Sequence, residues 1–134
     1  LVQWSQDLAD TSGARERLAN WLAALKPADF ASATLINNAG VLPAVVPLGE
    51  VPEAQLVNAL RVGLEAPMQL TAAFLAATGA WAQAGWQGPR KVLNISSGLG
   101  RNAMASQSPY CAAKAGMDHF TRCCALEEAN RPNG

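Results

Sequence analysis

The sequence predicts an α/β fold in which a parallel sheet is covered by helices. Two short apolar runs, residues 33–37 and 92–96, end in small polar residues, as buried strands commonly do. Between and after these runs, apolar residues recur at three- and four-residue spacing over long stretches, which is typical of helices. Strands that alternate with helices in this way indicate βαβ units, whose strands run parallel.

The first part of the chain predicts a strand, a helix and a second strand. Residues 1–5 form the expected first strand. Ser12 is expected to cap a helix over residues 13–25, because serine accepts a hydrogen bond from the first free backbone N–H groups. The apolar stripe of this helix consists of Ala14, Leu18, Trp21, Leu22 and Leu25. The run 33–37 follows as a strand and ends in the turn Ala39-Gly40.

A long helix is predicted over residues 52–78, with Pro52 in its first turn. Pro67 lies inside it, and because proline has no N–H to donate, we expect a kink near Gly63. Residues 79–89 are predicted to form a loop before the strand 92–96. The face expected to be buried carries Leu56, Leu60, Leu64, Met68, Thr71 and Leu75.

The last helix is expected to begin at Ser108-Pro109 and to continue to about Ala129. Serine is a favoured cap, and proline suits the first helical position because its N–H would have no partner there. The sequence Arg-Pro-Asn-Gly of residues 131–134 predicts a turn.

Composition limits the classes of function. The chain has 134 residues, and we expect residues 1–134 to form a single domain. Hydrophobic residues make up 50% and charged residues 15%, and the net charge is zero, which excludes disorder and gives no attraction for nucleic acid. No apolar run reaches the roughly 20 residues that span a bilayer. We expect neither nucleic acid nor membrane as a partner.

The three cysteines, Cys111, Cys123 and Cys124, form no pattern that predicts disulfides or a metal site. Their number is odd, two are adjacent, and no Cys-x-x-Cys spacing occurs. His119 is the single histidine and completes no metal-binding set at a familiar spacing. We therefore expect no metal and a reducing, cytoplasmic compartment.

Tyr110 and Lys114 are the first pair of residues that suggests chemistry. In a helix this spacing places both side chains on one face, with Cβ atoms about 5–6 Å apart. A phenol in water keeps its proton until about pH 10, and a neighbouring ammonium group stabilises the phenolate. The pair is therefore suited to proton transfer to or from a carbonyl oxygen.

The other candidate residues lie at the ends of the two predicted strands. Ser97 follows the strand 92–96, and Asn37-Asn38-Ala39-Gly40 ends the strand 33–37. Open parallel sheets place functional groups at such ends. Each motif also has a simpler interpretation, because serine before glycine often bonds its own backbone and Asn-Asn-Ala-Gly can be a plain turn. In the functional interpretation, the small residues let the backbone approach a flat cofactor.

The order and spacing of these motifs resemble the short-chain dehydrogenase/reductase family. The shared pattern is Asn-Asn-Ala-Gly after a strand, a long helix, Asn-Ile-Ser-Ser at a second strand end, and Tyr-x-x-x-Lys beyond it. Residues 110–114 (Tyr-Cys-Ala-Ala-Lys) and 125–128 (Ala-Leu-Glu-Glu) are most similar to the sepiapterin reductase and benzil reductase branch. The resemblance covers nearly the whole chain and implies a Rossmann-like, doubly wound parallel sheet that binds a nicotinamide cofactor.

The resemblance also implies a role for each matching residue. Tyr110 would donate a proton to the substrate carbonyl or accept one from an alcohol, and Ser97 would hydrogen-bond the reacting oxygen. Lys114 would stabilise the phenolate form of the tyrosine and hold the ribose hydroxyls of the nicotinamide. NADP(H) would be the cofactor, a small carbonyl or alcohol the substrate, and a homo-oligomer (a dimer or tetramer) the assembly. The cofactor would be contacted by Asp7, Leu8, Asn38, Ala39, Gly40, Tyr110 and Lys114.

Two features depart from the family pattern or imitate it. Gly63 stands where the long helix usually carries an asparagine that holds a water in the proton relay, and Asn58 cannot replace it because it lies about 140° away around the helix. We expect a proton relay through a backbone carbonyl and water, and a turnover rate that is lower but not abolished.

The stretch 98–103 has the form Gly-x-Gly-x-x-Ala of a dinucleotide fingerprint, but no helix is predicted to begin there, so we expect a substrate-side loop.

By the same resemblance, the family's glycine-rich loop would precede Leu1 and its last strands would follow Gly134. We therefore expect residues 1–134 to be an interior part of the fold, an incomplete sheet that binds no cofactor in isolation. In the strand order 3-2-1-4-5-6, two absent strands would separate residues 1–5 from 33–37.

The alternative function is a non-catalytic dinucleotide-binding regulator or assembly protein of the same fold. Gly63 favours this alternative, whereas an intact set of Ser97, Tyr110 and Lys114 opposes it, because a regulator needs no proton donor.

Overall fold

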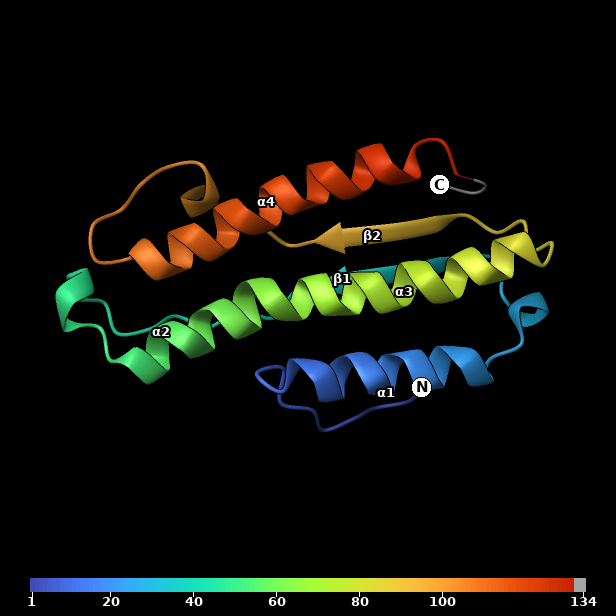
Figure 1. Cartoon of the computed structure of the whole chain (residues 1–134), viewed down its shortest axis with the longest axis horizontal. Helices are drawn as coiled ribbons and strands as arrows, with labels where there is room; N and C mark the ends of the chain where they lie inside the picture. The colour runs from blue at the N-terminus through green and yellow to red at the C-terminus, as the bar shows by residue number, and fades with distance from the viewer. Residues whose placement is uncertain (132–134) are drawn as a thin grey trace.

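The computed structural model describes residues 1–131 as a small parallel sheet with helices on one face (Figure 1). Strands β1 (Ala33–Asn37) and β2 (Arg90–Asn94) pair in parallel, with Ala33 opposite Arg90 and Asn37 opposite Asn94. The predicted α/β class with a parallel sheet is confirmed. The helices are α1 (Thr11–Ala24), α2 (Glu53–Leu60), α3 (Ala66–Gln83) and α4 (Ser108–Glu128).

Residues 1–5 form no strand, so this prediction is wrong. The segment is irregular, and Leu1 and Val2 are exposed. A strand needs a neighbour that accepts its backbone hydrogen bonds, and neither β1 nor β2 pairs with this segment. It is held instead by side chains of α1, since Arg17 donates to the Ser5 carbonyl at 2.9 Å.

Helix α1 starts at Thr11 because Asp10, rather than the predicted Ser12, caps it. The Asp10 carboxylate accepts a hydrogen bond from the Gly13 N–H at 3.1 Å. The predicted stripe of this helix faces the core in part, through Leu22, which packs with Phe74 and Trp81 of α3. These three side chains join α1 to the long helix beneath the sheet.

The predicted long helix is a rod of three parts, α2, a π-helical turn (Arg61–Glu65, the π turn) and α3 (Figure 1). The irregularity expected near Gly63 is this π turn, in which the Ala66 N–H donates to the Arg61 carbonyl. The rod ends at Gln83 and β2 begins at Arg90, so the observed loop is shorter than the predicted loop 79–89.

The buried face of the rod agrees with the predicted one only in part, since Thr71 is buried and Leu75 packs against the core. Small residues such as Ala59 and Ala66 are buried, whereas Met68 is 42% exposed. The leucines predicted for that face, Leu56, Leu60 and Leu64, are half-buried. Small side chains on the buried face let the rod lie close to α4 and the sheet.

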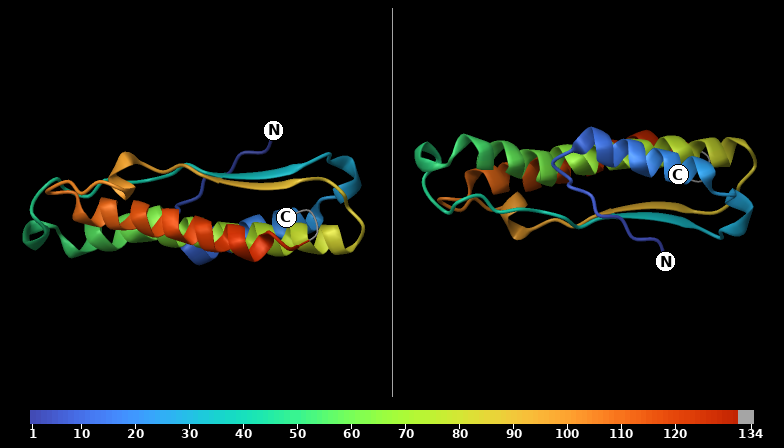
Figure 2. Two further views of the ribbon diagram at one scale, coloured as in Figure 1. Left: turned by 90° about the horizontal axis from the view of Figure 1, so that it is seen from above. Right: turned by 90° about the horizontal axis from the view of Figure 1, so that it is seen from below.

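The helices lie on one face of the sheet and leave the other face bare (Figure 2). Ile36 and Leu93 are register partners, and they remain 58% and 51% exposed on that face.

Strand β2 begins and ends two residues before the predicted strand 92–96.

Helix α4 begins at Ser108, so Gln107 rather than Ser108 is its cap residue. Of the predicted turn 131–134, residues 132–134 lie outside the described residues. None of the helices in residues 1–131 is both long and apolar enough to cross a membrane.

Candidate active site

Lys114 is the most buried charged side chain of the candidate site, with 4% of its surface exposed. Its ammonium nitrogen (Nζ) donates a hydrogen bond of 2.9 Å to the carbonyl oxygen of Ile95, just beyond β2. A Cβ atom built on Gly40, just beyond β1, would lie 3.8 Å from the same nitrogen. Lys114 therefore lies at the carboxyl ends of both strands. No carboxylate within residues 1–131 forms an ion pair with it.

Tyr110 lies one helical turn before Lys114 and is half-buried. The Lys114 Nζ is 5.6 Å from the centre of the Tyr110 ring, which confirms that the two side chains share one face of α4. The Tyr110 hydroxyl has no hydrogen-bond partner within residues 1–131. It is therefore available to a carbonyl or alcohol group that approaches this end of the sheet.

Ser97 caps a short 3-10 helix, Gly98–Gly100, that follows β2. Its hydroxyl oxygen accepts a hydrogen bond of 3.2 Å from the Leu99 N–H, so the simpler interpretation of Ser97 as a turn residue is observed. That bond uses a lone pair of the oxygen, so the hydroxyl proton remains available for donation. Both interpretations of Ser97 are compatible.

The short helix 98–100 is held close to α4 at Lys114. A Cβ atom on Gly100 would lie 3.3 Å from the Lys114 carbonyl and 2.7 Å from a carboxylate oxygen of Asp118, so a side chain here would require Asp118 to move. The stretch 98–103, which imitates a dinucleotide fingerprint, thus contributes a short 3-10 helix that packs on α4 through Gly100, and no long helix starts there.

A buried polar network, which the sequence did not reveal, joins the two strand ends to α3 and α4. The side-chain amide of Asn37 donates to the Asn94 oxygen at 2.8 Å and to the Thr71 hydroxyl at 3.3 Å. Asn94 in turn donates to the Thr121 hydroxyl at 2.8 Å. The one available signal was that an asparagine ends each strand, at partner positions in the register. The network therefore fixes the carboxyl end of β2, next to the Ile95 carbonyl that accepts the hydrogen bond from Lys114.

Four of the predicted cofactor residues, but not Gly40, Tyr110 or Lys114, line two hollows. Leu8, Asn38 and Ala39 line one hollow of about 200 Å³ together with residues of the π turn and α3. Asp7 lines a separate, wider hollow with Asp10 and Arg61 of other elements, and its carboxylate accepts a hydrogen bond of 2.9 Å from the Ala9 N–H. The structure therefore brings Leu8 to the Asn-Asn-Ala-Gly turn, whereas Asp7 mainly shapes the turn that precedes α1.

The segment before α4 contains a strained residue and an unpaired acceptor. Ser106 adopts a positive φ of 62°, which is uncommon for a residue with a side chain. Next to it, the side-chain oxygen of Gln107 is buried and has no hydrogen-bond partner within residues 1–131. Gln107 lies three residues before Tyr110, so this acceptor belongs to the same end of α4.

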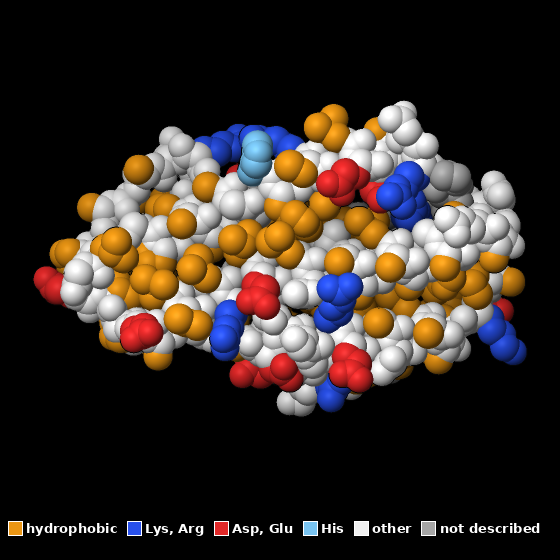
Figure 3. Space-filling model, in the orientation of Figure 1, with side chains coloured by type: hydrophobic (Ala, Val, Ile, Leu, Met, Phe, Trp, Pro, Cys, Tyr) orange, Lys and Arg blue, Asp and Glu red, His pale blue; other side chains and the backbone are white. Residues whose placement is uncertain are grey.

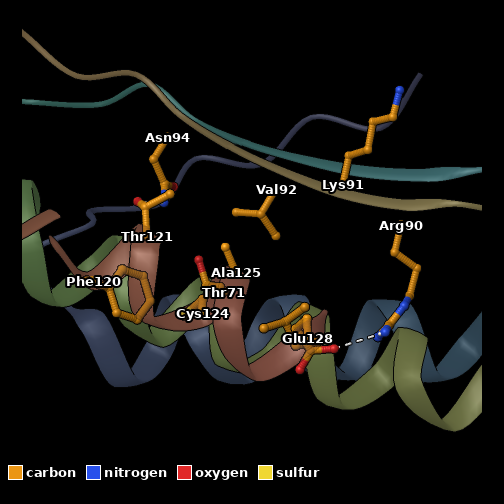
Figure 4. A pocket seen from close by; sticks show the side chains of 11 residues that line it. Thr71, Arg90, Lys91, Val92, Asn94, Phe120, Thr121, Cys124, Ala125 and Glu128 are labelled. Carbon is orange, nitrogen blue, oxygen red and sulfur yellow. Dashed lines mark hydrogen bonds and ion pairs between the residues drawn. The ribbon is translucent and has the colours of Figure 1, made fainter. Parts of the chain in front are cut away.

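A second cavity lies away from these residues, between β2, α3 and α4 (Figure 4). It has a volume of about 150 Å³ and contains the ion pair between Arg90 and Glu128, with 2.9 Å between nitrogen and oxygen. Burial and the nearby Glu127 carboxylate raise the pKa of the Cys124 thiol, which lines the same cavity. None of the predicted site residues lines it.

Hydrophobic side chains gather in a band along the rod and α4 on the face shown in Figure 3. A hollow of about 340 Å³ on the rod is lined by Val57, Leu60, Leu64 and Met68, together with the charged residues Arg61 and Glu65. Within residues 1–131, no group of three or more histidine, cysteine, aspartate or glutamate side chains could hold a metal ion.

The chain matches the sequence profile described as short chain dehydrogenase over residues 2–132. It is 33% identical over 127 residues to a benzil reductase ((S)-benzoin forming) of Bacillus cereus, covering 95% of this chain and 49% of that one. A second benzil reductase, from Bacillus subtilis, is 31% identical and is covered to 51%. The chain therefore spans about half the length of these curated relatives.

Solved structures show the same relationship. A short-chain dehydrogenase/reductase from Burkholderia vietnamiensis has a TM-score of 0.73 and 38% identity, with 94% of this chain and 56% of that one covered. A metagenomic short-chain oxidoreductase in complex with NADP has a TM-score of 0.77 and 29% identity, with 94% and 52% covered.

Proposed function

The chain belongs to the short-chain dehydrogenase/reductase family, with its Rossmann-like α/β fold, and we propose that it carries the catalytic residues of an NADP(H)-dependent carbonyl reductase. The single observation that supports this most strongly is the Tyr110 and Lys114 pair on one face of α4, at the end of the sheet. Family membership supports the oxidoreductase class. The residue roles, cofactor and substrate that follow are the proposal.

The surroundings of Lys114 fit a nicotinamide dinucleotide. A buried ammonium group has a high cost unless its N–H groups are satisfied, and within residues 1–131 Lys114 has one acceptor, the Ile95 carbonyl. An ammonium group has three donors, so two remain for hydroxyl groups of a ribose. Gly40 has no side chain between its backbone and this nitrogen, so a flat group can approach closely.

The remaining cofactor contacts are proposed from the neighbouring loops. Asn38, Ala39 and Gly40 would lie along the dinucleotide. Leu8, which shares a hollow with Asn38 and Ala39, would contact its adenine side. Asp7 would contact the cofactor only at the edge of the site, since its carboxylate already accepts a hydrogen bond in the turn before α1. When bound, the cofactor supplies or accepts a hydride at the carbonyl carbon.

The protein residues would handle the proton and the developing charge. As hydride reaches the carbonyl carbon, the phenol of Tyr110 would transfer its proton to the carbonyl oxygen, and Lys114 would stabilise the phenolate that remains. The Ser97 hydroxyl, held by its bond from Leu99, would donate to the same oxygen and stabilise its negative charge. In the alcohol direction, each step would run in reverse.

For the substrate we propose a small carbonyl compound, and benzil is the first candidate because two relatives are named benzil reductases. We propose that the partner is a second copy of the protein, which would contact the hydrophobic band that includes Val57 and Met68. The free cysteines fit the reducing, cytoplasmic compartment expected from the sequence.

The test is NADPH oxidation by the full-length protein with benzil as substrate. We expect turnover by the wild type, and a loss of at least about 100-fold in the Tyr110→Phe variant, because general acid catalysis contributes roughly that much. Wild-type turnover in Tyr110→Phe would contradict the proposed role. NADPH binding without turnover, by both proteins, would favour the non-catalytic regulator.

A further inference from the structure

We propose that Gly63 sets the distance between the π turn and α4, and thereby positions the ammonium group of Lys114. The inference rests on the proposed function, in which Lys114 holds the cofactor and assists Tyr110. It assigns a structural reason to the glycine that replaces the family's asparagine. Gly63 would act through Lys114 as a positioning residue rather than as a catalytic one.

The contact that carries the proposal is between Gly63 and Ala113. A Cβ atom built on Gly63 would lie 3.2 Å from the Cβ of Ala113, which is closer than most real contacts between such atoms. Both residues are buried, and Ala113 is only 2% exposed. Any side chain at position 63 would therefore press on α4 at Ala113.

The surroundings leave the pressed helix little freedom to move elsewhere. One turn further along, a Cβ atom on Gly116 would lie 3.2 Å from the Leu64 side chain, so the π turn and α4 are closely packed at two points. On another side, Gly100 is in close contact with the Lys114 backbone. A displacement at Ala113 is therefore transmitted to its neighbour Lys114.

A small displacement matters because, within residues 1–131, a single hydrogen bond holds Lys114 Nζ close to the turn at Gly40. The nitrogen donates to the Ile95 carbonyl at 2.9 Å and lies 3.8 Å from the Cβ position of Gly40. A shift of a few tenths of an ångström would change the reach of the ammonium group toward the ribose and toward Tyr110. Restoring an asparagine at position 63 would press on Ala113 rather than supply the missing relay.

The first test is a cycle of three variants of the full-length protein: Gly63→Ala, Ala113→Gly, and both together. We expect Gly63→Ala to raise the KM for NADPH about 3- to 10-fold and to change the pH profile of kcat, because small misplacements at an active site have effects of this size. The double variant removes the methyl group from the opposite side of the contact and should return both parameters to within about twofold of the wild type.

A second readout needs no turnover. In the cofactor-free protein, Lys114 is acylated with a small amine-reactive reagent, and mass spectrometry measures the rate of labelling. A slow rate indicates that the hydrogen bond to Ile95 and burial keep the ammonium group in place. We expect slow labelling in the wild type, labelling several-fold faster in Gly63→Ala, and slow labelling again in the double variant. Gly79→Ala is the matched control, because Gly79 lies in α3 and its added Cβ would meet an ordinary contact of 3.6 Å.

The outcomes separate the inference from the proposed function. Unchanged KM and labelling in Gly63→Ala would overturn the inference, and so would changes that Ala113→Gly does not reverse. If Gly63→Ala does not fold, Ala113→Val presses on the same contact from the other side and should give the same changes. If the wild type lacks turnover but the labelling follows the cycle, the positioning by Gly63 stands and the reductase proposal fails.

Discussion

At the scale of single residues, each of the three candidate side chains keeps a group that is free to act, and two of them are fixed by a hydrogen bond. Ser97 accepts from Leu99 and keeps its proton, whereas Lys114 donates to Ile95 and keeps two further donors. The Tyr110 hydroxyl is free within residues 1–131. Side chains fixed in this way need little reorganisation when a substrate arrives, which is the usual basis of electrostatic catalysis.

The two adjacent cysteines differ in ways that can be measured. Burial and neighbouring carboxylates raise the pKa of Cys124, so at a given pH a smaller fraction of this thiol is the reactive thiolate. Cys123 is exposed. We expect iodoacetamide to alkylate Cys123 first at pH 8, and Cys124 to react appreciably only at higher pH, as measured by peptide mass spectrometry. Equal rates in the folded protein would contradict this, and the urea-unfolded protein is the control.

At the scale of elements, glycines determine how closely the 3-10 helix 98–100 approaches α4. Gly100→Ala would introduce a Cβ atom 3.3 Å from the Lys114 backbone and 2.7 Å from the Asp118 carboxylate. We expect this variant to displace Ser97 and to lower kcat about 10-fold or more, since a misplaced donor loses much of its stabilisation.

Gly98→Ala is the matched control for that experiment, because a Cβ atom there would have no neighbour within 4 Å. It adds the same methyl group to the same short helix and should retain wild-type kcat. If both variants behave alike, close packing of the turn on α4 is not what positions Ser97.

The elements also show what a sequence can predict. Strand β1 was predicted to the residue, because an apolar run bounded by small and polar residues is a local pattern typical of strands. Residues 1–5 have a similar local pattern and form no strand, because strand formation also depends on a paired neighbour. The long helix was predicted, but its buried face only in part: Thr71 is buried as predicted, whereas Ala59 and Ala66 are buried in place of the predicted Met68.

For the candidate site, the residue types and their order were predictable from the sequence, but the contacts that hold these side chains in place were not. The Tyr110 and Lys114 pairing follows from helical periodicity, which the 5.6 Å contact confirms. The acceptor of Lys114, the Asn37 and Asn94 network and the contact of Gly63 with Ala113 join segments that are distant in the sequence. Such contacts depend on tertiary structure, so no local pattern predicts them.

At the scale of the whole molecule, the most prominent feature is a sheet covered on one face only (Figure 2). Ile36 and Leu93 are exposed on the bare face, and such patches on soluble proteins mark surfaces that another segment or chain covers. The chain spans about half of its curated relatives, in which further chain is available for this purpose.

This arrangement predicts how residues 1–134 behave when produced alone. We expect the isolated segment to bind the hydrophobic dye ANS strongly, to self-associate, and to show no binding of NADPH by calorimetry. The full-length protein, under the same conditions, should bind NADPH and little dye. Clear NADPH binding by the isolated segment would contradict the expectation that the segment alone lacks a complete cofactor site.

The most direct test of the proposed chemistry is the rate of hydride transfer in a single turnover of the full-length protein, followed by the loss of NADPH absorbance on mixing with benzil. We expect Ser97→Ala and Tyr110→Phe each to lower this rate by about 100-fold or more. Because both side chains would act on one carbonyl oxygen, the double variant should be little slower than the slower single variant. Hydride transfer at the wild-type rate in Tyr110→Phe would contradict the assignment of Tyr110 as the proton donor.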